Sequence, residues 1–592
     1  MENPLLELQE YENLQEALKK AKGPVQATGT LDSQKVHLMY WLGKDGGFPW
    51  KLVVTYDDQR AREIYDDFRS FTENVWLYPA KDLLFYSADI HGNLMTRQRI
   101  AVWRHLMEEK EGVVVTTLDG LMDHLLPLVF LKQQAVTVEN GQIMDLDEWK
   151  ERLTALGYER TAQVDGMGQF SIRGGIVDIF PLTEEVPVRI ELWDDEVDSI
   201  RSFDPESQRS VEQLEKITIY PSAETILTKK QLEAGIERLE KEEKEYEAAL
   251  RAKHQIEEAS RIRGIIKELT EGIRQGWKRD GLDAYIRYFC PETVSFLDYF
   301  PAGDTLICLD EPARLKEKGE TVEQEFRESM IHRLEKGYLL PGQTELLYAG
   351  TQVLAKLQSS YTVMLTGLDQ KLPGMKVKEK FSFDVRNVNS YQNSFDMLIS
   401  DLTRWKKEGY RVVLLSASRT RASRLASDLR EYDLRAYCPD GTGEEHKAAP
   451  GEILVTYGNI HRGFEYPLIK YVIITEGDMF GTEKKKKRRK KSNYQGKAIQ
   501  SFSELAVGDY VVHEEHGLGI YKGIEKVERD KVIKDYIKIE YGGGGNLYLP
   551  ATRLESIQKY AGADAKKPKL NKLGGTEWNK TKTRVKGAVQ EI

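Results

Sequence analysis

Cysteine is scarce in this 592-residue chain. The three that occur, Cys290, Cys308 and Cys438, lie far apart and form no CxxC pair. This excludes a disulfide framework, and we expect no structural zinc site. His513 and His516 do not have the HExxH spacing of a helical zinc motif either, so we predict no metal site in the chain.

Long apolar runs are also missing. No stretch reaches the roughly 18 uninterrupted apolar residues of a membrane span, and the most apolar run, Leu121–Leu131, contains Asp123 and His124. Hydrophobic residues nevertheless make up 40% of the chain and charged residues 31%, a composition that supports several buried cores. We therefore expect a cytoplasmic protein without membrane contact and with roughly four domains.

A basic surface is a third absence. The net charge is −9, although Lys484–Lys491 is an unbroken basic run, so the rest of the chain is still more acidic. Such a chain does not resemble a general nucleic-acid binder, and we expect DNA contacts to be local or supplied by other parts of a larger protein. We interpret the basic run as part of a solvated linker over residues 481–502, because like charges repel and keep the backbone extended.

Residues 1–150 alternate short apolar strands with amphipathic helices. Lys51–Tyr56 precedes a helical pattern over Asp57–Phe71, and Val113–Thr117 precedes a second one over Leu118–Leu125. Unbroken apolar strands between helices predict a parallel sheet that is covered on both faces.

Residues 151–222 have a different character. Phe170–Phe180 and Val188–Trp193 have the composition of strands and are separated by the turn-like Thr183–Glu185. This pattern predicts a β-hairpin in a small α+β domain. Residues 223–350 are first helical and heavily charged, and then contain the apolar strand Thr305–Leu309. If that strand joins the first sheet, residues 151–222 are an insertion that splits one domain.

The remaining chain predicts two further folded units. Residues 351–480 form a second α/β unit with a helix over Arg419–Glu431 and strands at Thr362–Leu365, Val412–Leu415, Ile453–Tyr457 and Tyr471–Thr475. Residues 503–565 predict a small closed β-barrel with strands at Tyr510–His513, Ile520–Val527, Tyr536–Tyr541 and Leu547–Leu549. Glu577–Ile592 predicts a helix that is cut short, so we expect a piece of a longer protein.

An incomplete phosphate-binding loop lies at residues 29–36, before the strand Lys51–Tyr56. Gly29 and Lys35 have the spacing of GxxxxGK[ST], but Gln34 replaces the second glycine and Val36 replaces the hydroxyl that would ligate Mg²⁺. Asp32 would repel phosphate in addition. We therefore predict no nucleotide hydrolysis at this loop, and no catalytic residue and no cofactor in this chain.

Asp310 and Glu311 follow the strand Thr305–Leu309 and allow two interpretations. An apolar strand that ends in an acidic pair can deliver carboxylates to a metal-bound phosphate. Alternatively, the two acids cap the next helix, with Pro312 in its first turn. The broken lysine loop favours the capping interpretation.

The strand Val188–Trp193 offers a candidate binding face. Side chains alternate along a strand, so Arg189, Glu191 and Trp193 share one face, and Arg173 of the preceding strand can join them. Arginine and tryptophan around an acid are typical of an interface hot spot. The alternative is an arginine stem that covers a half-buried tryptophan, and the residues alone leave both open.

Several segments together resemble a known family. Phe170–Pro181 (FSIRGGIVDIFP), Arg189 and Phe203–Arg209 (FDPESQR) resemble the damage-binding module of UvrB, and are more similar still to the transcription-repair coupling factor family. Further similar segments are Tyr78–Ala80, Asp82–Tyr86, Gly508–His513, His516–Gly519, Lys572–Gly575 and Trp578. The last two match the segment that leads into the motor of that family, and the resemblance is collinear over nearly the whole chain.

The resemblance implies an architecture and a role for each part. Residues 1–150 and 223–350 would be a degenerate RecA-like domain, residues 151–222 an inserted UvrA-binding domain, and residues 351–480 a further α/β domain without catalytic duty. Residues 503–565 would be a Tudor/SH3-like, CarD-type domain that binds RNA polymerase, and residues 566–592 would start the linker helix to the motor.

The resemblance also implies site residues and partners. Arg173, Arg189 and Trp193 fall on the UvrA-binding surface of the family. Val527 aligns with the apolar centre of a strand-pairing contact with the RNA polymerase β subunit, flanked by Ile524 and Glu525. The pattern of Ile520–Val527 leaves the facing of Val527 open. ATP, Mg²⁺ and most DNA contacts are expected only for the family's motor domains, which make the full-length members ATP-dependent DNA translocases.

The resemblance therefore predicts an adaptor in transcription-coupled nucleotide-excision repair. Two alternatives belong to other classes: a UvrB-like damage-verification ATPase, which requires an intact phosphate loop, and a CarD-like transcription regulator, which binds polymerase without a repair role.

Overall fold

The fold is known from a computed structural model of the chain. It describes residues 3–20, 23–81, 93–164, 166–205, 207–275, 281–358, 361–372, 374–392, 394–439, 448–481, 497–498, 507–513, 516–529, 532–542, 545–550, 557–559 and 570. The basic run Lys484–Lys491 and the predicted helix Glu577–Ile592 lie outside these residues.

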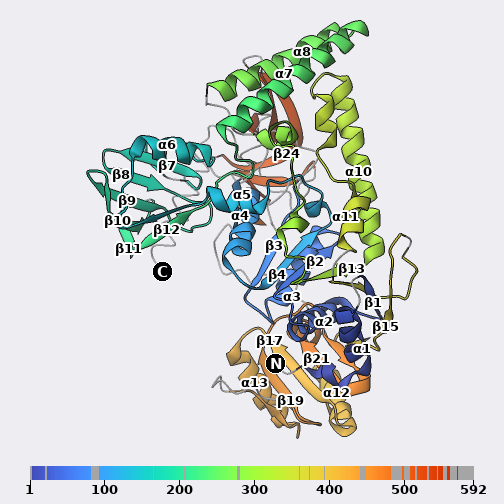
Figure 1. The fold of residues 1–592 in the computed structure, drawn as a ribbon. Coiled ribbons are helices and arrows are strands. Elements are labelled where there is room, and N and C mark those ends of the chain that lie inside the picture. The colour runs from blue at the N-terminus through green and yellow to red at the C-terminus, as the bar shows by residue number, and fades with distance from the viewer. Residues whose placement is uncertain are drawn as a thin grey trace.

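A seven-stranded parallel sheet forms the centre of the molecule (Figure 1). In the order β15-β1-β14-β13-β2-β4-β3, its strands are Lys380–Ser382, Val25–Thr28, Tyr361–Thr366, Thr305–Asp310, Trp50–Thr55, Gly112–Thr117 and Val75–Tyr78. Every neighbouring pair is parallel. Because β13 lies between β2 and β14, the chain leaves this sheet after β4 and returns to it, which confirms the predicted insertion.

Both faces of the sheet are buried. Leu52 and Val54 of β2 point into one core and Val53 of the same strand into another. Helices on the Val53 side are α1 (Gln9–Lys20), α2 (Asp32–Asp45) and α3 (Asp58–Phe68), and those on the other side include α4 (Asn93–Glu108), α10 (Pro312–Glu335) and α11 (Gly350–Leu357). Two buried faces explain why the strands read as unbroken apolar runs.

Two sequence predictions for this region are wrong. Thr362–Leu365 was assigned to the second α/β unit, but β14 pairs with β1 and β13 in the first sheet. An apolar strand carries no signal for which sheet it joins, so tertiary pairing decides. Leu118–Leu125 is not a continuous helix: only a 3₁₀ turn forms at Asp119–Leu121, and the backbone of Leu125 bonds instead to that of Val294.

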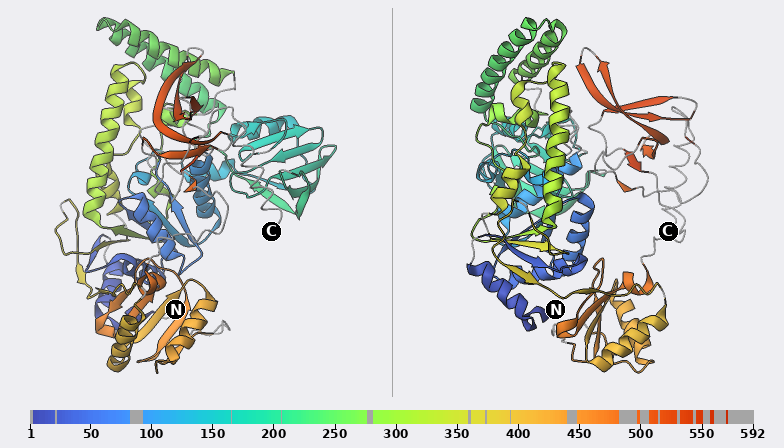
Figure 2. Two further views of the ribbon diagram at one scale, coloured as in Figure 1. Left: turned by 180° about the vertical axis from the view of Figure 1, so that it is seen from behind. Right: turned by 90° about the vertical axis from the view of Figure 1, so that its right-hand side faces the viewer.

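The insertion is a second, antiparallel-rich sheet that projects from the body (Figure 2). In the order β11-β10-β9-β8-β7-β6, its strands are Ser210–Leu214, Glu196–Phe203, Val188–Trp193, Ile176–Ile179, Gln169–Arg173 and Glu159–Arg160. Helix α6 (Leu146–Ala155) contributes Trp149 and Leu153 to the core that the inner face shares. Strands β5 (Val136–Glu139) and β12 (Lys216–Ile219) pair with each other where the chain enters and leaves the insertion.

A buried ion cluster joins the insertion to the body. The Arg99 guanidinium of α4 lies 2.9 Å from Asp123 and 3.0 Å from Glu224, which follows the insertion. Lys81 lies 3.0 Å from Glu224 and 3.3 Å from Asp283. Burial alone would lower the pKa of Lys81, but the carboxylates of Glu224 and Asp283 hold it above its ordinary value. These charges tie the end of the insertion to segments far away in sequence.

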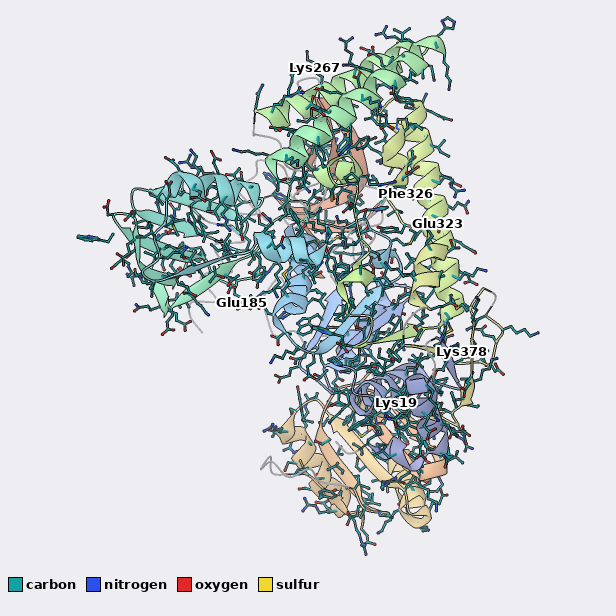
Figure 3. All side chains as sticks on the ribbon, in the orientation of Figure 1. Lys19, Glu185, Lys267, Glu323, Phe326 and Lys378 are labelled. Atoms are coloured by element: carbon teal, nitrogen blue, oxygen red, sulfur yellow. The ribbon has the colours of Figure 1, made fainter. Side chains whose placement is uncertain are left out.

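Two long helices extend beyond the sheet. Helices α7 (Lys229–Ala252) and α8 (Ile256–Arg274) pack on each other through a small core of their own, at the top of Figure 1. Charged side chains such as Lys267 cover their outer surface (Figure 3). Shorter helices are α5 (Leu128–Gln134) and α9 (Ile286–Phe289). The predicted helical character of the first part of residues 223–350 is thereby confirmed.

The second α/β unit has a six-stranded sheet. In the order β16-β20-β21-β17-β19-β18, the strands are Arg386–Asn387, Phe464–Tyr466, Tyr471–Thr475, Arg411–Ser416, Ile453–Tyr457 and Ala436–Tyr437. Its helices are α12 (Phe395–Glu408), α13 (Arg419–Arg430) and α14 (Glu476–Phe480). The three predicted strands β17, β19 and β21 are parallel neighbours, and α13 confirms the predicted helix.

The second unit and the first share one core. His37 of α2 is buried and its ring lies 5.4 Å from that of Phe464 and 5.8 Å from that of Tyr466. Nδ1 of His37 is 3.1 Å from the Tyr466 hydroxyl, and the Trp41 indole donates a hydrogen bond to Nε2. Burial lowers the pKa of His37 to about 3, so the ring is neutral at pH 7.

The last sheet has the order β22-β27-β23-β24-β25-β26. Its strands are Lys497–Ala498, Ile557–Lys559, Tyr510–His513, Gly517–Arg529, Val532–Glu540 and Asn546–Pro550. The predicted strands are confirmed. Among the described residues no pairing joins β22 to β26, so the closed barrel stays a prediction. No helix in the described part of the chain is long and apolar enough to cross a membrane.

The buried His37 predicts a pH-dependent stability. Its folded-state pKa lies below the ordinary value of about 6.5, so the unfolded chain binds more protons between these values. Stability contributed by neutral His37 is therefore complete above about pH 6.5 and declines as the pH falls, by up to about 1.4 kcal/mol per pH unit. We expect His37→Gln to flatten this decline in thermal unfolding measured from about pH 4 to 7.

His461→Gln is the matched control with the opposite sign. A hydrogen bond to Asp67 raises the pKa of His461, so its stabilisation is present below about pH 6.5 and is lost as the pH rises through its folded-state pKa. Because His461 is partly exposed, the effect is smaller. If the stability of His37→Gln declined between pH 7 and pH 4 as steeply as that of the unsubstituted chain, the prediction would be wrong.

Candidate functional site

The remnant phosphate loop lies at the carboxyl end of β1, before α2. Gly29 has a φ of 74°, and a Cβ there would lie 2.2 Å from the Phe383 carbonyl oxygen, so only glycine fits. Lys35 is buried, with Nζ 2.7 Å from Asp310 Oδ1 and 2.6 Å from Glu311 Oε1. The structure thus brings Lys35 together with Asp310 and Glu311, and the lysine binds the chain's own carboxylates.

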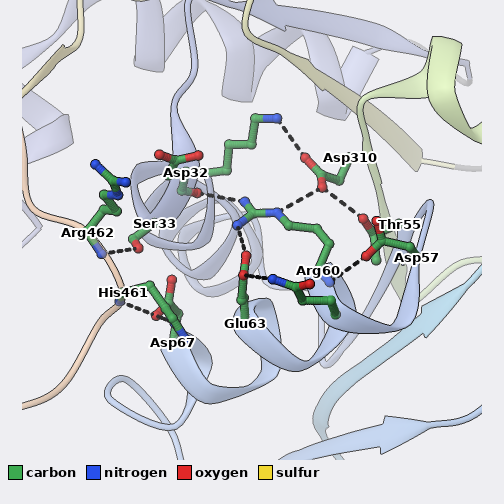
Figure 4. Close-up of polar contacts among 12 residues, drawn as sticks. Asp32, Ser33, Thr55, Asp57, Arg60, Glu63, Asp67, Asp310, His461 and Arg462 are labelled. Carbon is green, nitrogen blue, oxygen red and sulfur yellow. Dashed lines mark hydrogen bonds and ion pairs between the residues drawn. The ribbon is translucent and has the colours of Figure 1, made fainter. Parts of the chain in front are cut away.

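Two further side chains donate hydrogen bonds to Asp310 (Figure 4). Its Oδ2 accepts hydrogen bonds from the Thr55 hydroxyl at 2.9 Å and from Arg60 Nε at 3.3 Å. Arg60 also donates to the Asp32 carbonyl oxygen at 3.0 Å. Burial alone would raise the pKa of Asp310, but Lys35 and Arg60 hold it below its ordinary value. Asp310 is therefore a paired carboxylate within the protein.

Glu311 has a different role from the predicted side-chain cap. It occupies the N-cap position of α10, with Pro312 at the start of the helix, but its side chain makes no cap hydrogen bond. The carboxylate instead accepts from the Gly367 amide at 2.9 Å as well as from Lys35. Its φ of 50° shows why: the left-handed backbone turns the side chain away from the first turn of the helix.

Two residues of the incomplete loop motif, Ser33 and Gln34, contact the second α/β unit. Gln34 donates a hydrogen bond to the Tyr466 hydroxyl at 3.0 Å, and Ser33 accepts one from the Arg462 amide at 3.0 Å. Nearby, Asp67 accepts bonds from both the amide and Nδ1 of His461 (Figure 4). Sequence reasoning did not identify these contacts, because their partners lie about 400 residues away.

The candidate binding face of the insertion is confirmed as an outward face. Val188 and Ile190 are buried, whereas Trp193 at the end of β9 is 81% exposed. The alternative interpretation, a half-buried tryptophan under an arginine stem, is therefore wrong. An exposed tryptophan of this extent is unusual on a protein surface and is typical of a partner contact.

One carboxylate organises the two arginines of this face. Asp178 of β8 is 1% exposed, and its Oδ1 accepts from Arg189 Nε at 2.7 Å. Its Oδ2 accepts from Arg189 Nη2 at 2.9 Å and from Arg173 Nη2 at 2.8 Å. The hydrogen bond to Asp178 raises the pKa of Arg189. The sequence signal for Asp178 is an acid inside an apolar strand, Ile176–Ile179.

The last sheet presents a partly unpaired strand. β24 pairs with β23 only over Gly517–Ile520, whereas its pairing with β25 continues to Arg529. In the described part of the chain, residues 523–529 therefore have a strand partner on one side alone. Glu525 is exposed and lies 2.6 Å from Lys538, and Ile524 packs partly against the core. The side chain of Val527 lies outside the described residues, so its facing stays a prediction.

Comparisons with known proteins place both candidate surfaces in recognised domains. Residues 136–224 match the model described as the UvrB interaction domain, which contains Arg173, Arg189 and Trp193. Residues 505–561 match the CarD-like/TRCF RID domain, which contains β23, β24 and β25.

Whole-chain relatives agree with the two domain matches. The chain is 34% identical over 546 residues to the transcription-repair-coupling factor of Bacillus subtilis (strain 168), and 32% identical over 548 residues to that of Staphylococcus haemolyticus (strain JCSC1435). Each alignment covers 91% of this chain and 45% of the relative, so the chain spans a little under half the length of these relatives. The chain is thus similar to members of the transcription-repair-coupling factor family through 91% of its residues, and the similarity includes both domains.

Proposed function

We propose that this chain is an adaptor in transcription-coupled nucleotide-excision repair, which binds RNA polymerase through the last sheet and UvrA through the inserted domain. The observation that carries the proposal is an exposed Trp193 at the end of the strand that carries Arg189, together with two arginines held on a buried carboxylate, all within the UvrB interaction domain. Tryptophan and arginine are the residues most enriched in interface hot spots. We further propose that the protein works in the cytoplasm.

The polymerase contact is proposed to be a β-augmentation. Residues 523–529 of β24 have one free edge in the described part of the chain, and an added strand can pair there through main-chain hydrogen bonds. We propose the RNA polymerase β subunit as the partner, with Val527 at the centre of the contact and Ile524 and Glu525 beside it. The match of this region to the CarD-like/TRCF RID domain supports the choice.

The remnant phosphate loop is proposed to hold no nucleotide. A RecA-like origin of the first sheet explains the positions of Gly29, Lys35 and Asp310, but Lys35 is paired with two carboxylates and Gln34 is bonded to Tyr466. A phosphate would have to displace these buried contacts. ATP and Mg²⁺ are therefore proposed to serve only the motor domains of the family, together with most DNA contacts and the displacement of polymerase.

Each of the two rival functions has one requirement that distinguishes it from the proposed adaptor. A UvrB-like damage-verification ATPase requires nucleotide at the loop, which the ion pairs of Lys35 oppose. A CarD-like regulator requires polymerase but not UvrA, and would leave the face around Trp193 without a role.

Substitution of the exposed tryptophan tests the UvrA contact. We expect Trp193→Ala and Arg189→Ala each to weaken UvrA binding by at least ~2 kcal/mol, or about 30-fold, by isothermal titration calorimetry. Trp193 is exposed, so its removal should leave the melting temperature unchanged. Val129→Ala is the control, since Val129 is a similarly exposed apolar residue on α5, outside the insertion. Unchanged UvrA affinity in both variants would favour the CarD-like rival.

Substitution in β24 tests the polymerase contact. We expect the chain to bind an isolated β-subunit lobe of RNA polymerase, and Val527→Arg to abolish that binding because a charge would enter the apolar centre of the contact. Val129→Arg makes the same change at an exposed residue elsewhere and should bind normally. Binding that survives Val527→Arg would move the contact to another surface, and a folded chain that does not bind at all would refute the coupling role.

Removal of the loop lysine tests the nucleotide proposal. Lys35→Ala leaves the buried Asp310 with fewer partners, so we expect a loss of about 3 kcal/mol in chemical denaturation. The more exposed pair of Lys318 with Asp119 provides the control, and Lys318→Ala should cost about 1 kcal/mol or less. MgATP should not raise the melting temperature of the unsubstituted chain. ATP binding that Lys35→Ala abolishes would support the ATPase rival instead.

A further inference from the structure

Arg189 is held more firmly than a surface arginine normally is. Besides its two bonds to Asp178, Nη2 donates to Gln208 Oε1 at 3.1 Å, and the guanidinium carbon lies 4.6 Å from the centre of the Phe203 ring. Gln208 is itself anchored by a bond from its side-chain amide to the Pro205 carbonyl at 2.9 Å. The loop after β10 therefore supports Arg189 from one side and Asp178 supports it from another.

Of the partners of Arg189, Arg173 contacts only the carboxylate of Asp178. It donates one bond to Asp178, from Nη2, and its side chain is 48% exposed. In the described part of the chain, Nε and Nη1 of Arg173 and Nη1 of Arg189 have no hydrogen-bond partner. These N–H groups can therefore bind an incoming acceptor while Asp178 keeps the two guanidinium groups next to each other.

Among the described residues, the charges of the cluster do not balance. Two guanidinium groups share the single buried carboxylate of Asp178, which leaves one positive charge without a carboxylate partner in this part of the chain. Glu191, another acid of β9, forms an ion pair with Arg201 of β10. A carboxylate from a partner protein would complete the cluster, since planar guanidinium groups bind carboxylates bidentately.

We propose that Asp178 is a positioning residue of the UvrA-binding face, which holds Arg173 and Arg189 side by side so that together they receive a carboxylate of UvrA. The inference rests on the proposed UvrA-binding function and adds to it the chemical class of group that the face recognises. Asp178 itself is only 1% exposed, so it acts on a partner through the two arginines.

Binding kinetics of the full 592-residue chain on immobilised UvrA test this role. We expect Asp178→Asn to weaken the affinity at least about tenfold through faster dissociation, because the guanidinium groups lose their common anchor. The association rate should not fall, because the substitution makes the face more positive towards an acidic partner. A fold defect would instead reduce the fraction of binding-competent protein, which the association phase reports.

A double-mutant cycle separates positioning from a general structural effect. In the Arg173→Ala, Arg189→Ala background, Asp178→Asn should weaken UvrA binding by less than about twofold further, since no arginine remains to be positioned. The matched control is Glu184→Gln, which makes the same chemical change at the pair of Glu184 with Arg104, 3.0 Å apart, on the border of the insertion. This control should bind UvrA like the unsubstituted chain.

Arg189→Lys gives a second test that does not disturb the buried acid. Lysine keeps the charge but cannot form the forked contact with Asp178, so we expect a loss of affinity of at least about tenfold. Normal affinity of Arg189→Lys, normal affinity of Asp178→Asn, or full additivity in the cycle would overturn the inference while leaving the UvrA contact intact. Failure of the unsubstituted chain to bind UvrA would overturn the proposed function and this inference with it.

Discussion

Burial of both faces of one parallel sheet is the constraint on which the rest of the structure depends. β13, β14 and β15 come from residues beyond 300 and must pair with β1 and β2 to complete that sheet. The chain between β4 and β13 is then forced outward, into the inserted domain and the long helices. The inner face of the insertion's sheet packs into the same core as one face of the central sheet, and Trp193 at the end of β9 is left exposed.

The carboxyl edge of this sheet forms an internal contact. In parallel α/β sheets this edge normally receives a phosphate ligand. Here Lys35 and Arg60 form ion pairs with Asp310, Lys35 also pairs with Glu311, and Ser33 and Gln34 bond to the second α/β unit. The same positions that would cradle a nucleotide therefore fasten two units of the chain to each other, and the buried His37 adds apolar contacts to that junction.

The two proposed partner surfaces differ in the chemical groups that they offer to a partner. The face around Trp193 offers side chains: an exposed aromatic ring and two arginines whose geometry is set in advance by Asp178, so little entropy is lost on binding. The far part of β24 offers backbone groups along a strand edge, where affinity depends on main-chain pairing and less on residue type. An adaptor needs two sites that do not compete, and these lie on separate sheets.

The sequence alone determined most of the strands and helices, and which residues of Val188–Trp193 share a face. Strands such as Val412–Leu415 and helices such as Arg419–Arg430 follow from apolar periodicity, and alternation along Val188–Trp193 placed Arg189 and Trp193 on one face. The family resemblance supplied the site residues, since no local pattern separates a hot spot from a covered tryptophan. The tertiary structure alone decided that Tyr361–Thr366 belongs to the first sheet, that Glu311 binds Lys35 rather than capping its helix, and that Asp178 joins two arginines. Each of these depends on residues brought together from distant segments or across strands, where local sequence carries no information about which partner is chosen.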